Sequence, residues 1–143
     1  MKIITLPDIR LLRKCEEVKI IDNEIKLAVK EMKDLLLENN GYGLAAPQVG
    51  ILKRFFIMLD KFGEIKTFIN PLIISIKGRK VYADEGCLSI PGVTISVPRY
   101  EKIKISYFDL DGEEYIKEYR DNLARVIQHE YEHLDGKLIT DYI

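Results

Sequence analysis

The 143-residue sequence contains no tryptophan, only two histidines and two cysteines, and almost no net charge. Lysine and arginine together number 22, against 23 aspartates and glutamates, so no overall field attracts nucleic acid or an anionic membrane. No segment approaches the ~20 apolar residues of a membrane span, and the apolar run at the N-terminus is too short for a signal peptide. We therefore expect a cytoplasmic protein that binds neither nucleic acid nor a membrane directly.

The composition is that of a globular protein, with 47% hydrophobic and 31% charged residues. A chain of this length can bury one substantial core but not two ordinary ones. We expect residues 1–143 to form a single domain that acts as a monomer.

Two segments have the spacing of apolar residues that predicts a helix. In residues 22–39 these residues fall on one helical face, with Asp22 or Asn23 expected to cap the start. A final helix is predicted to begin after a cap at Asp121 or Asn122 and to end at Asp135-Gly136. Its apolar residues imply that it is buried on more than one side.

The middle of the chain predicts strands instead. Short β-branched or aromatic runs indicate strands at residues 54–59, 66–70 and 72–76, the last two separated by Asn70-Pro71. Alternating residues 102–107 indicate another strand, followed by a tight hairpin turn at Asp111-Gly112. The expected fold class is α+β, with antiparallel strands packed around the buried final helix.

The final helix contains the sequence HEYEH. Its two histidines, His129 and His133, are four residues apart, so both project from one face and can bind the same metal ion, with Glu130 beside it. The alternative is a polar stripe with solvated histidines. Two histidines placed at random fall four residues apart in roughly 1% of arrangements, and the apolar neighbours oppose a solvated stripe, so we favour the metal site.

A catalytic metal site usually has three protein ligands and one open position. No further histidine is available, and Glu132 lies on the wrong side of the predicted helix. Cys87 is the natural third ligand, because a thiolate binds soft metals and Gly86 permits a close approach within the EGCLS segment. Without the histidines, Cys87 would be interpreted as a buried structural thiol, which is the interpretation we keep for Cys15.

The segment Gly41–Gln48, GYGLAAPQ, is rich in small residues. It lacks the Lys and Ser/Thr of a phosphate-binding loop, so a nucleotide site is a weak interpretation. Its small residues suit backbone contact with an extended ligand, and the amide of Gln48 can donate to a developing oxyanion. A tight turn with a solvated Gln48 is an equally good interpretation of this segment alone.

The three stretches GYGLAAPQ, EGCLS and HEYEH, in this order, resemble the three signature motifs of the peptide deformylase family. The resemblance covers nearly the whole chain, from Pro7-Asp8 to the final helix. It implies a hydrolase that removes the N-formyl group from formylmethionyl peptides of newly made proteins and releases formate. The metal that the resemblance implies is Fe²⁺, replaceable by Zn²⁺, Ni²⁺ or Co²⁺.

By the same resemblance, Cys87, His129 and His133 correspond to the metal ligands and Glu130 to the catalytic carboxylate. Glu130 would take a proton from the water that attacks the formyl carbon and pass it to the leaving amine. In the family a buried ion pair braces the metal-binding strand. Glu85 and Arg99 match it, although the sequence alone equally allows two solvated charges.

The resemblance also assigns residues that contact the substrate. Gln48 and the backbone N–H of Leu88 correspond to oxyanion donors, and the peptide would lie extended along the glycine-rich segment. Binding positions are implied at Gly41, Tyr42, Gly43, Ala83 and Val126. Many bacterial members of the family continue into a C-terminal helix implicated in ribosome docking. This sequence does not show that helix, so we do not expect it to dock on ribosomes by that route.

Two other functions fit part of the pattern. A metallopeptidase that cleaves internal peptide bonds would use the same helix, but it would commonly take a third ligand downstream of the motif. A metal-stabilised peptide-binding module would need a fourth protein ligand to close its site, and the sequence offers only three.

Overall fold

The computed structural model describes residues 1–143 and contains five strands, two α-helices and three short 3-10 helices. The strands are β1 (Gly43–Ala45), β2 (Phe55–Leu59), β3 (Ile65–Cys87), β4 (Ile90–Phe108) and β5 (Glu114–Arg120). The helices are α1 (Asn23–Glu38), α2 (Asp121–His133), η1 (Ile9–Leu12), η2 (Ala46–Val49) and η3 (Ile139–Tyr142). The predicted α+β class is confirmed.

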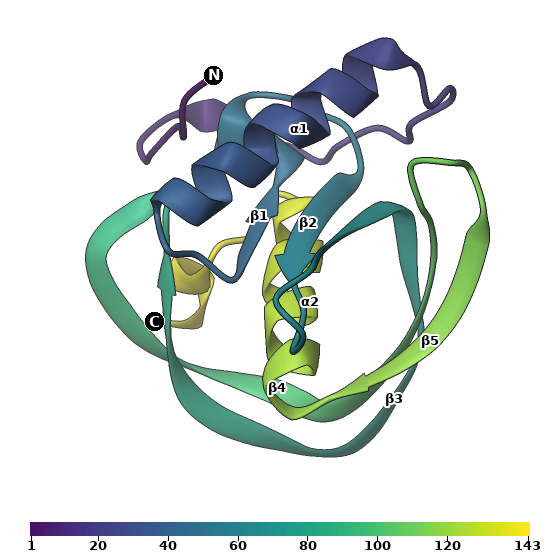
Figure 1. Cartoon of the computed structure of the whole chain (residues 1–143). Helices are drawn as coiled ribbons and strands as arrows, with labels where there is room; N and C mark the ends of the chain where they lie inside the picture. The colour runs from purple at the N-terminus through teal and green to yellow at the C-terminus, as the bar shows by residue number, and fades with distance from the viewer.

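All five strands form one antiparallel sheet in the order β1-β2-β3-β4-β5. The long strands β3 and β4 form a curved ribbon around α2, while α1 lies across β1 and β2 (Figure 1). The helix with the HEYEH sequence therefore occupies the inside of the curved sheet, as predicted. β1 has only one neighbouring strand, so its outer edge has no strand partner.

The prediction of separate strands at residues 66–70 and 72–76 is wrong, because both belong to β3. Asn70-Pro71 forms a bulge, where the register with β4 shifts between Ile69 and Leu72. The Asn70 side chain accepts a hydrogen bond from the Val18 N–H and donates one to the Val18 carbonyl, both at 2.8 Å. These bonds attach Asn70 to another segment, and Pro71 has no N–H to donate to the neighbouring strand. The strand therefore bulges at Asn70-Pro71 but does not end there.

The helix caps follow the sequence in one case and not in the other. Asp22 caps α1, its Oδ1 accepting a hydrogen bond from the Ile25 N–H at 3.0 Å. The predicted cap of α2 by Asp121 or Asn122 is wrong. β5 leads directly into the helix, so Arg120 occupies the N-cap position, and its side chain makes no capping hydrogen bond. Asp121 has a φ of 55°, and this left-handed residue turns the chain from strand to helix.

The turns at the other predicted positions are present. Residues 109–113 connect β4 to β5 around Asp111-Gly112, and Oδ1 of Asp109 accepts hydrogen bonds from the N–H groups of Asp111 and Glu113. After α2, Gly136 has a φ of 74°, and a Cβ there would lie 2.5 Å from the Leu12 carbonyl oxygen. Glycine is therefore required to end this helix.

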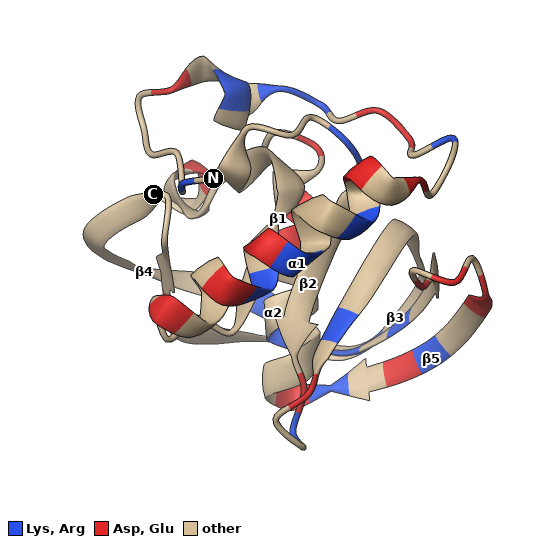
Figure 2. Ribbon diagram, turned by 45° about the horizontal axis from the view of Figure 1, so that its top comes forward, with Lys and Arg blue, Asp and Glu red and all other residues tan.

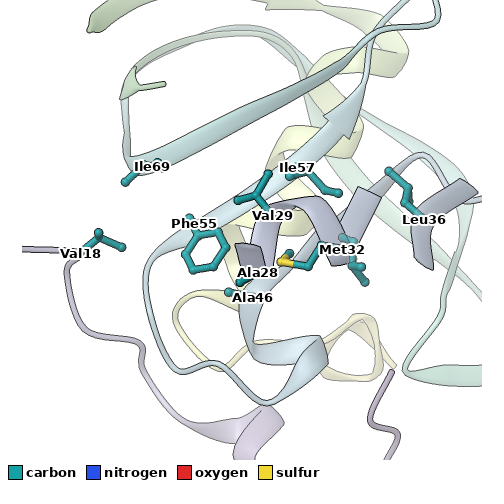
Figure 3. Packing of buried hydrophobic residues seen from close by; sticks show 10 residues of the cluster. Val18, Ala28, Val29, Met32, Leu36, Ala46, Phe55, Ile57 and Ile69 are labelled. Carbon is teal, nitrogen blue, oxygen red and sulfur yellow. The ribbon is translucent and has the colours of Figure 1, made fainter. Parts of the chain in front are cut away.

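The core has two main parts, on opposite sides of β2. Alternate residues of β2 point in opposite directions, so Phe55 and Ile57 face α1 while Phe56 and Met58 face α2. The α1 side is shown in Figure 3 and comprises Val18, Ala28, Val29, Met32, Leu36, Leu44, Ala46, Phe55, Ile57 and Ile69. The α2 side comprises Ala45, Phe56, Met58, Phe68, Ile103, Ile105, Tyr107, Ala124, Ile127 and Leu134.

Charged residues of both signs are interspersed along the exposed side of α1 and along β5 (Figure 2). This distribution agrees with the near-zero net charge. Neither helix combines the length and apolar character needed to cross a bilayer.

Phe68 supports the α2 side of the core, where its ring centroid lies 4.8 Å from that of Phe56 and 4.2 Å from that of Tyr107. Phe68→Ala should lower the free energy of unfolding by about 3–5 kcal/mol, because it leaves a cavity among well-packed rings. Phe62→Ala, at a side chain that is 80% exposed, should change it by less than about 0.5 kcal/mol. Urea unfolding followed by circular dichroism measures both, and equal effects would contradict this account of the core.

Candidate metal centre

The end of β3 and one face of α2 bring three potential metal ligands together. Cys87, His129 and His133 each offer one ligand atom, and these atoms lie within 4.8 Å of one another. Nε2 of His133 is 3.5 Å from Sγ of Cys87 and 3.3 Å from Nε2 of His129. The structure thus brings together the three residues that the sequence predicts as a ligand set.

A buried carboxylate, that of Glu85, fixes the orientation of the His129 ring. Its Nδ1 lies 2.9 Å from Oε1 of Glu85, so Nδ1 donates to the carboxylate and Nε2 is left to face Cys87 and His133. Arg99 donates to both oxygens of Glu85, from Nε at 3.0 Å and from Nη2 at 2.9 Å. The solvated interpretation of this pair is therefore excluded, since both side chains are buried.

The carboxyl group of Glu85 stays ionised in this environment. Burial raises its pKa, but the hydrogen bonds from His129 and Arg99 outweigh burial and lower the pKa to about 2. Because the ionised Glu85 holds the proton-bearing Nδ1 of His129, Nε2 is the nitrogen that can bind a cation.

Glu130 lies on the other side of His129 in a different environment. Its side chain is buried, Oε1 has no hydrogen-bond partner, and Oε2 is 4.0 Å from Nε2 of His129. Burial raises the pKa of Glu130 to about 7, against the lowering effect of the His129 charge. A carboxyl group with a pKa near neutrality can both accept and release a proton.

The charges around the imidazoles favour a bound cation. Burial lowers the pKa of His129, but Glu130, Cys87 and Glu85 together raise it to about 10. Burial and the neighbouring His129 charge hold the pKa of His133 well below its usual range. The pocket thus favours a positive charge beside His129, which a bound cation can supply in place of a proton, while His133 stays neutral.

The residues present fit a divalent metal. One thiolate and two imidazoles suit Fe²⁺, Zn²⁺, Ni²⁺ or Co²⁺, and three protein ligands leave a coordination position for water or substrate. Glu132 does not join them. It pairs instead with Arg99 and accepts a hydrogen bond from the Tyr142 hydroxyl, so the expected exclusion of this carboxylate is confirmed.

Gln48 is buried against the metal-binding strand, which excludes the solvated interpretation. Its Oε1 accepts a hydrogen bond from the Ala45 N–H at 2.9 Å, which directs Nε2 the other way. Nε2 lies 3.2 Å from Oγ of Ser89 and 3.5 Å from Sγ of Cys87. An amide donor therefore points toward the cysteine, beside Leu88 in the turn that joins Cys87 to Ile90.

The glycine-rich segment forms the wall opposite α2. A Cβ at Gly43 would lie 2.7 Å from Oε2 of Glu130 and 2.9 Å from Cγ1 of Val126, so no larger residue fits between β1 and the helix. Tyr42 is 70% exposed at the start of the outer β1 edge. Gly43 and Val126 thus lie beside Glu130, Gly41 and Tyr42 directly precede β1, and Ala83 lies on β3.

Two contacts of the site were not identified from the sequence. One is the hydroxyl of Ser89, which lies beside the Gln48 amide. The other is Arg125, which donates to Oε2 of Glu85 at 2.7 Å. The only local signal for Arg125 is its position four residues before His129, on the same helical face.

Comparison with known proteins gives one consistent result. The family model described as polypeptide deformylase matches residues 1–143. Peptide deformylase 1 of Clostridium perfringens is 46% identical over 134 residues, which cover 92% of this chain and 90% of that protein. The solved structure of peptide deformylase from Thermotoga maritima has a TM-score of 0.94 at 38% identity and covers 98% of this chain and 95% of that one.

A peptide deformylase from Ehrlichia chaffeensis, solved in complex with actinonin, has a TM-score of 0.96 at 38% identity. The match covers all of this chain and 88% of that one. The agreement therefore extends over the full fold and not only over the three motifs.

The two cysteines allow a matched test of the metal centre. The chain should bind about one divalent metal, and Cys87→Ala should weaken binding by more than about 100-fold because it removes a charged ligand. Cys15→Ala should retain the metal, since Cys15 is a free thiol buried in the core whose pKa burial raises to about 11. Zn²⁺ titration against a chromogenic chelator measures all three proteins, and equal affinities would contradict the assignment.

Proposed function

The chain belongs to the peptide deformylase family, metal-dependent hydrolases that remove the N-formyl group from N-terminal formylmethionine, and we propose which of its residues perform that reaction. Cys87, His129 and His133 hold one divalent metal, with Fe²⁺ as the physiological ion and Zn²⁺, Ni²⁺ and Co²⁺ as substitutes. When bound, the metal polarises the formyl oxygen and lowers the pKa of water.

Glu130 moves the proton. As water adds to the formyl carbon, Glu130 accepts a proton from it, and when the carbon–nitrogen bond breaks Glu130 returns that proton to the leaving nitrogen. The products are formate and a free amino terminus. The observation that carries this proposal is the buried Glu130 carboxyl group, which has an unpartnered oxygen and a pKa near 7 beside the three-ligand cluster.

Two donors stabilise the negative charge that develops on the formyl oxygen. They are Nε2 of Gln48, which already points toward Cys87, and the backbone N–H of Leu88 in the following turn. The Gln48 amide is held in place by its bond to Ala45, so it does not need to reorient during the reaction. A donor fixed in advance stabilises the transition state more than a mobile one does.

The substrate is a formylmethionyl peptide bound in extended form. We place it along Gly41, Tyr42 and Gly43, because β1 is an edge strand with no strand partner on its outer side, where a peptide can add as a further strand. Val126 on α2 and Ala83 on β3 then contact the methionine side chain. Residues 1–143 act as one catalytic domain, and we propose a monomeric cytoplasmic enzyme.

The reaction is tested by formate release from formyl-Met-Ala-Ser with protein purified without oxygen. Glu130→Gln should lower kcat by about 10²–10⁴-fold while it retains about one metal per chain, because the variant cannot transfer the proton. Glu132→Gln should keep most of the activity, since the new carbonyl oxygen can still accept from Arg99 while the amide N–H donates to the Tyr142 hydroxyl. Casein should not be cleaved. Failure of the metal-loaded parent to release formate would overturn the proposal.

A second variant separates charge stabilisation from substrate binding. Gln48→Met preserves the volume of the side chain but removes its amide donor, so kcat should fall by about 10²–10³-fold with little change in KM. Steady-state kinetics on the same peptide measure both constants. A rise in KM at constant kcat would instead assign Gln48 to substrate binding.

A further inference from the structure

The residues of the metal centre come from two elements, β3 and α2, that pack against each other. On β3, Glu85 and Cys87 are two residues apart, and both reach α2: Glu85 contacts His129 at 2.9 Å and Cys87 lies 3.5 Å from His133. On α2, Arg125, His129 and His133 follow at intervals of four residues and share one helical face. The distance between the cysteine and the two histidines therefore depends on how α2 is seated against β3.

Arg125 adds three hydrogen bonds between α2 and the two long strands. Its Nη1 donates to Oε2 of Glu85 at 2.7 Å and to the carbonyl of Val97 at 2.8 Å, and its Nη2 donates to the carbonyl of Val81 at 2.5 Å. Val81 belongs to β3 and Val97 to β4. One largely buried guanidinium thus joins α2 to both long strands and to the carboxylate that orients His129.

The other arginine on Glu85 reaches α2 only at a different point, through Glu132. Arg99 lies on β4, so its bidentate contact with Glu85 fixes one strand against the next. Arg99 also pairs with Glu132, and without Arg125 this single cation would face two carboxylates. Apart from the metal ligand His129 itself, Arg125 is the residue of α2 that holds Glu85.

We propose that Arg125 is a positioning residue that seats α2 against β3, sets the separation of Cys87 from His129 and His133, and thereby determines how long the metal is retained. The guanidinium acts through Glu85 and the two strand carbonyls and does not touch the metal. The inference rests on the proposed ligand role of the three residues.

The test is the rate at which bound Co²⁺ is lost to excess EDTA. Arg125→Met removes all three hydrogen bonds while keeping much of the side-chain volume, and it should speed Co²⁺ loss by about 10–100-fold. Arg125→Lys keeps the charge but not the fork that reaches three acceptors, so its rate should fall between those of the parent and the methionine variant. The visible absorption bands of Co²⁺, which report its ligand geometry, should shift in the same order.

Arg54 provides a matched control. It is a similarly buried arginine that holds the other end of α2, donating to the Leu134 carbonyl and to Oδ1 of Asp135, both at 2.9 Å, without contacting Glu85. Arg54→Met should lower the thermal unfolding temperature but leave the rate of Co²⁺ loss unchanged. A parental rate in Arg125→Met, or an equal acceleration in Arg54→Met, would overturn the inference.

The outcome does not depend on measuring deformylation. If Cys87→Ala still binds Co²⁺ like the parent, the proposed ligand set has failed, and the inference about Arg125 fails with it. If Cys87→Ala loses Co²⁺ but Arg125→Met keeps it as long as the parent does, only the inference about Arg125 is overturned.

Discussion

The buried carboxylate of Glu85 is the interaction on which the arrangement of the metal centre depends. A buried charge is strongly unfavourable unless it is paired and fully hydrogen-bonded, and Glu85 meets this requirement with Arg99, Arg125 and His129. These partners come from β4 and α2, so the charge is tolerated only when the curved sheet has formed and the helix has packed inside it. Glu85 can therefore orient His129 only when the sheet and α2 have assembled.

On the other side of the site, the segment from Gly43 to Gln48 contributes to both the core and the site. Leu44 points into the core beneath α1, while its neighbours Gly43 and Ala45 face the side of α2. The alternation of a strand thus lets three consecutive residues serve the core and the site at once. Gln48 follows on a short 3-10 helix that folds its amide back onto the Ala45 N–H, which places the donor beside Cys87.

Features set by short-range geometry could be predicted from the sequence. The shared face of His129 and His133 follows from helical periodicity, and the cap at Asp22 follows from its position before an apolar stripe. Features set by distant partners could not. Asn70-Pro71 has the composition of a chain break, yet hydrogen bonds to Val18 turn it into a bulge.

Arg125 has a related explanation, because its partners lie on two strands that the local sequence does not connect to it. Asp121 failed as a cap for another reason: it turns the chain at the junction between strand and helix. For Asn70, Arg125 and Asp121 alike, the local sequence does not show which other segment of the fold the residue meets. Cys87 could be predicted as the third ligand only because the chain offers so few alternatives.

The two carboxyl groups beside His129 illustrate how one fold assigns different chemistry to the same functional group. Glu85 receives charged donors on both oxygens, and its pKa falls to about 2, so it remains an anion and cannot carry a proton at neutral pH. Glu130 is equally buried but has an oxygen without any donor, and burial raises its pKa to about 7. Because opposite shifts of this kind separate a fixed charge from an exchangeable proton, Glu85 orients the histidine and Glu130 is left as the group that can exchange a proton with water and substrate.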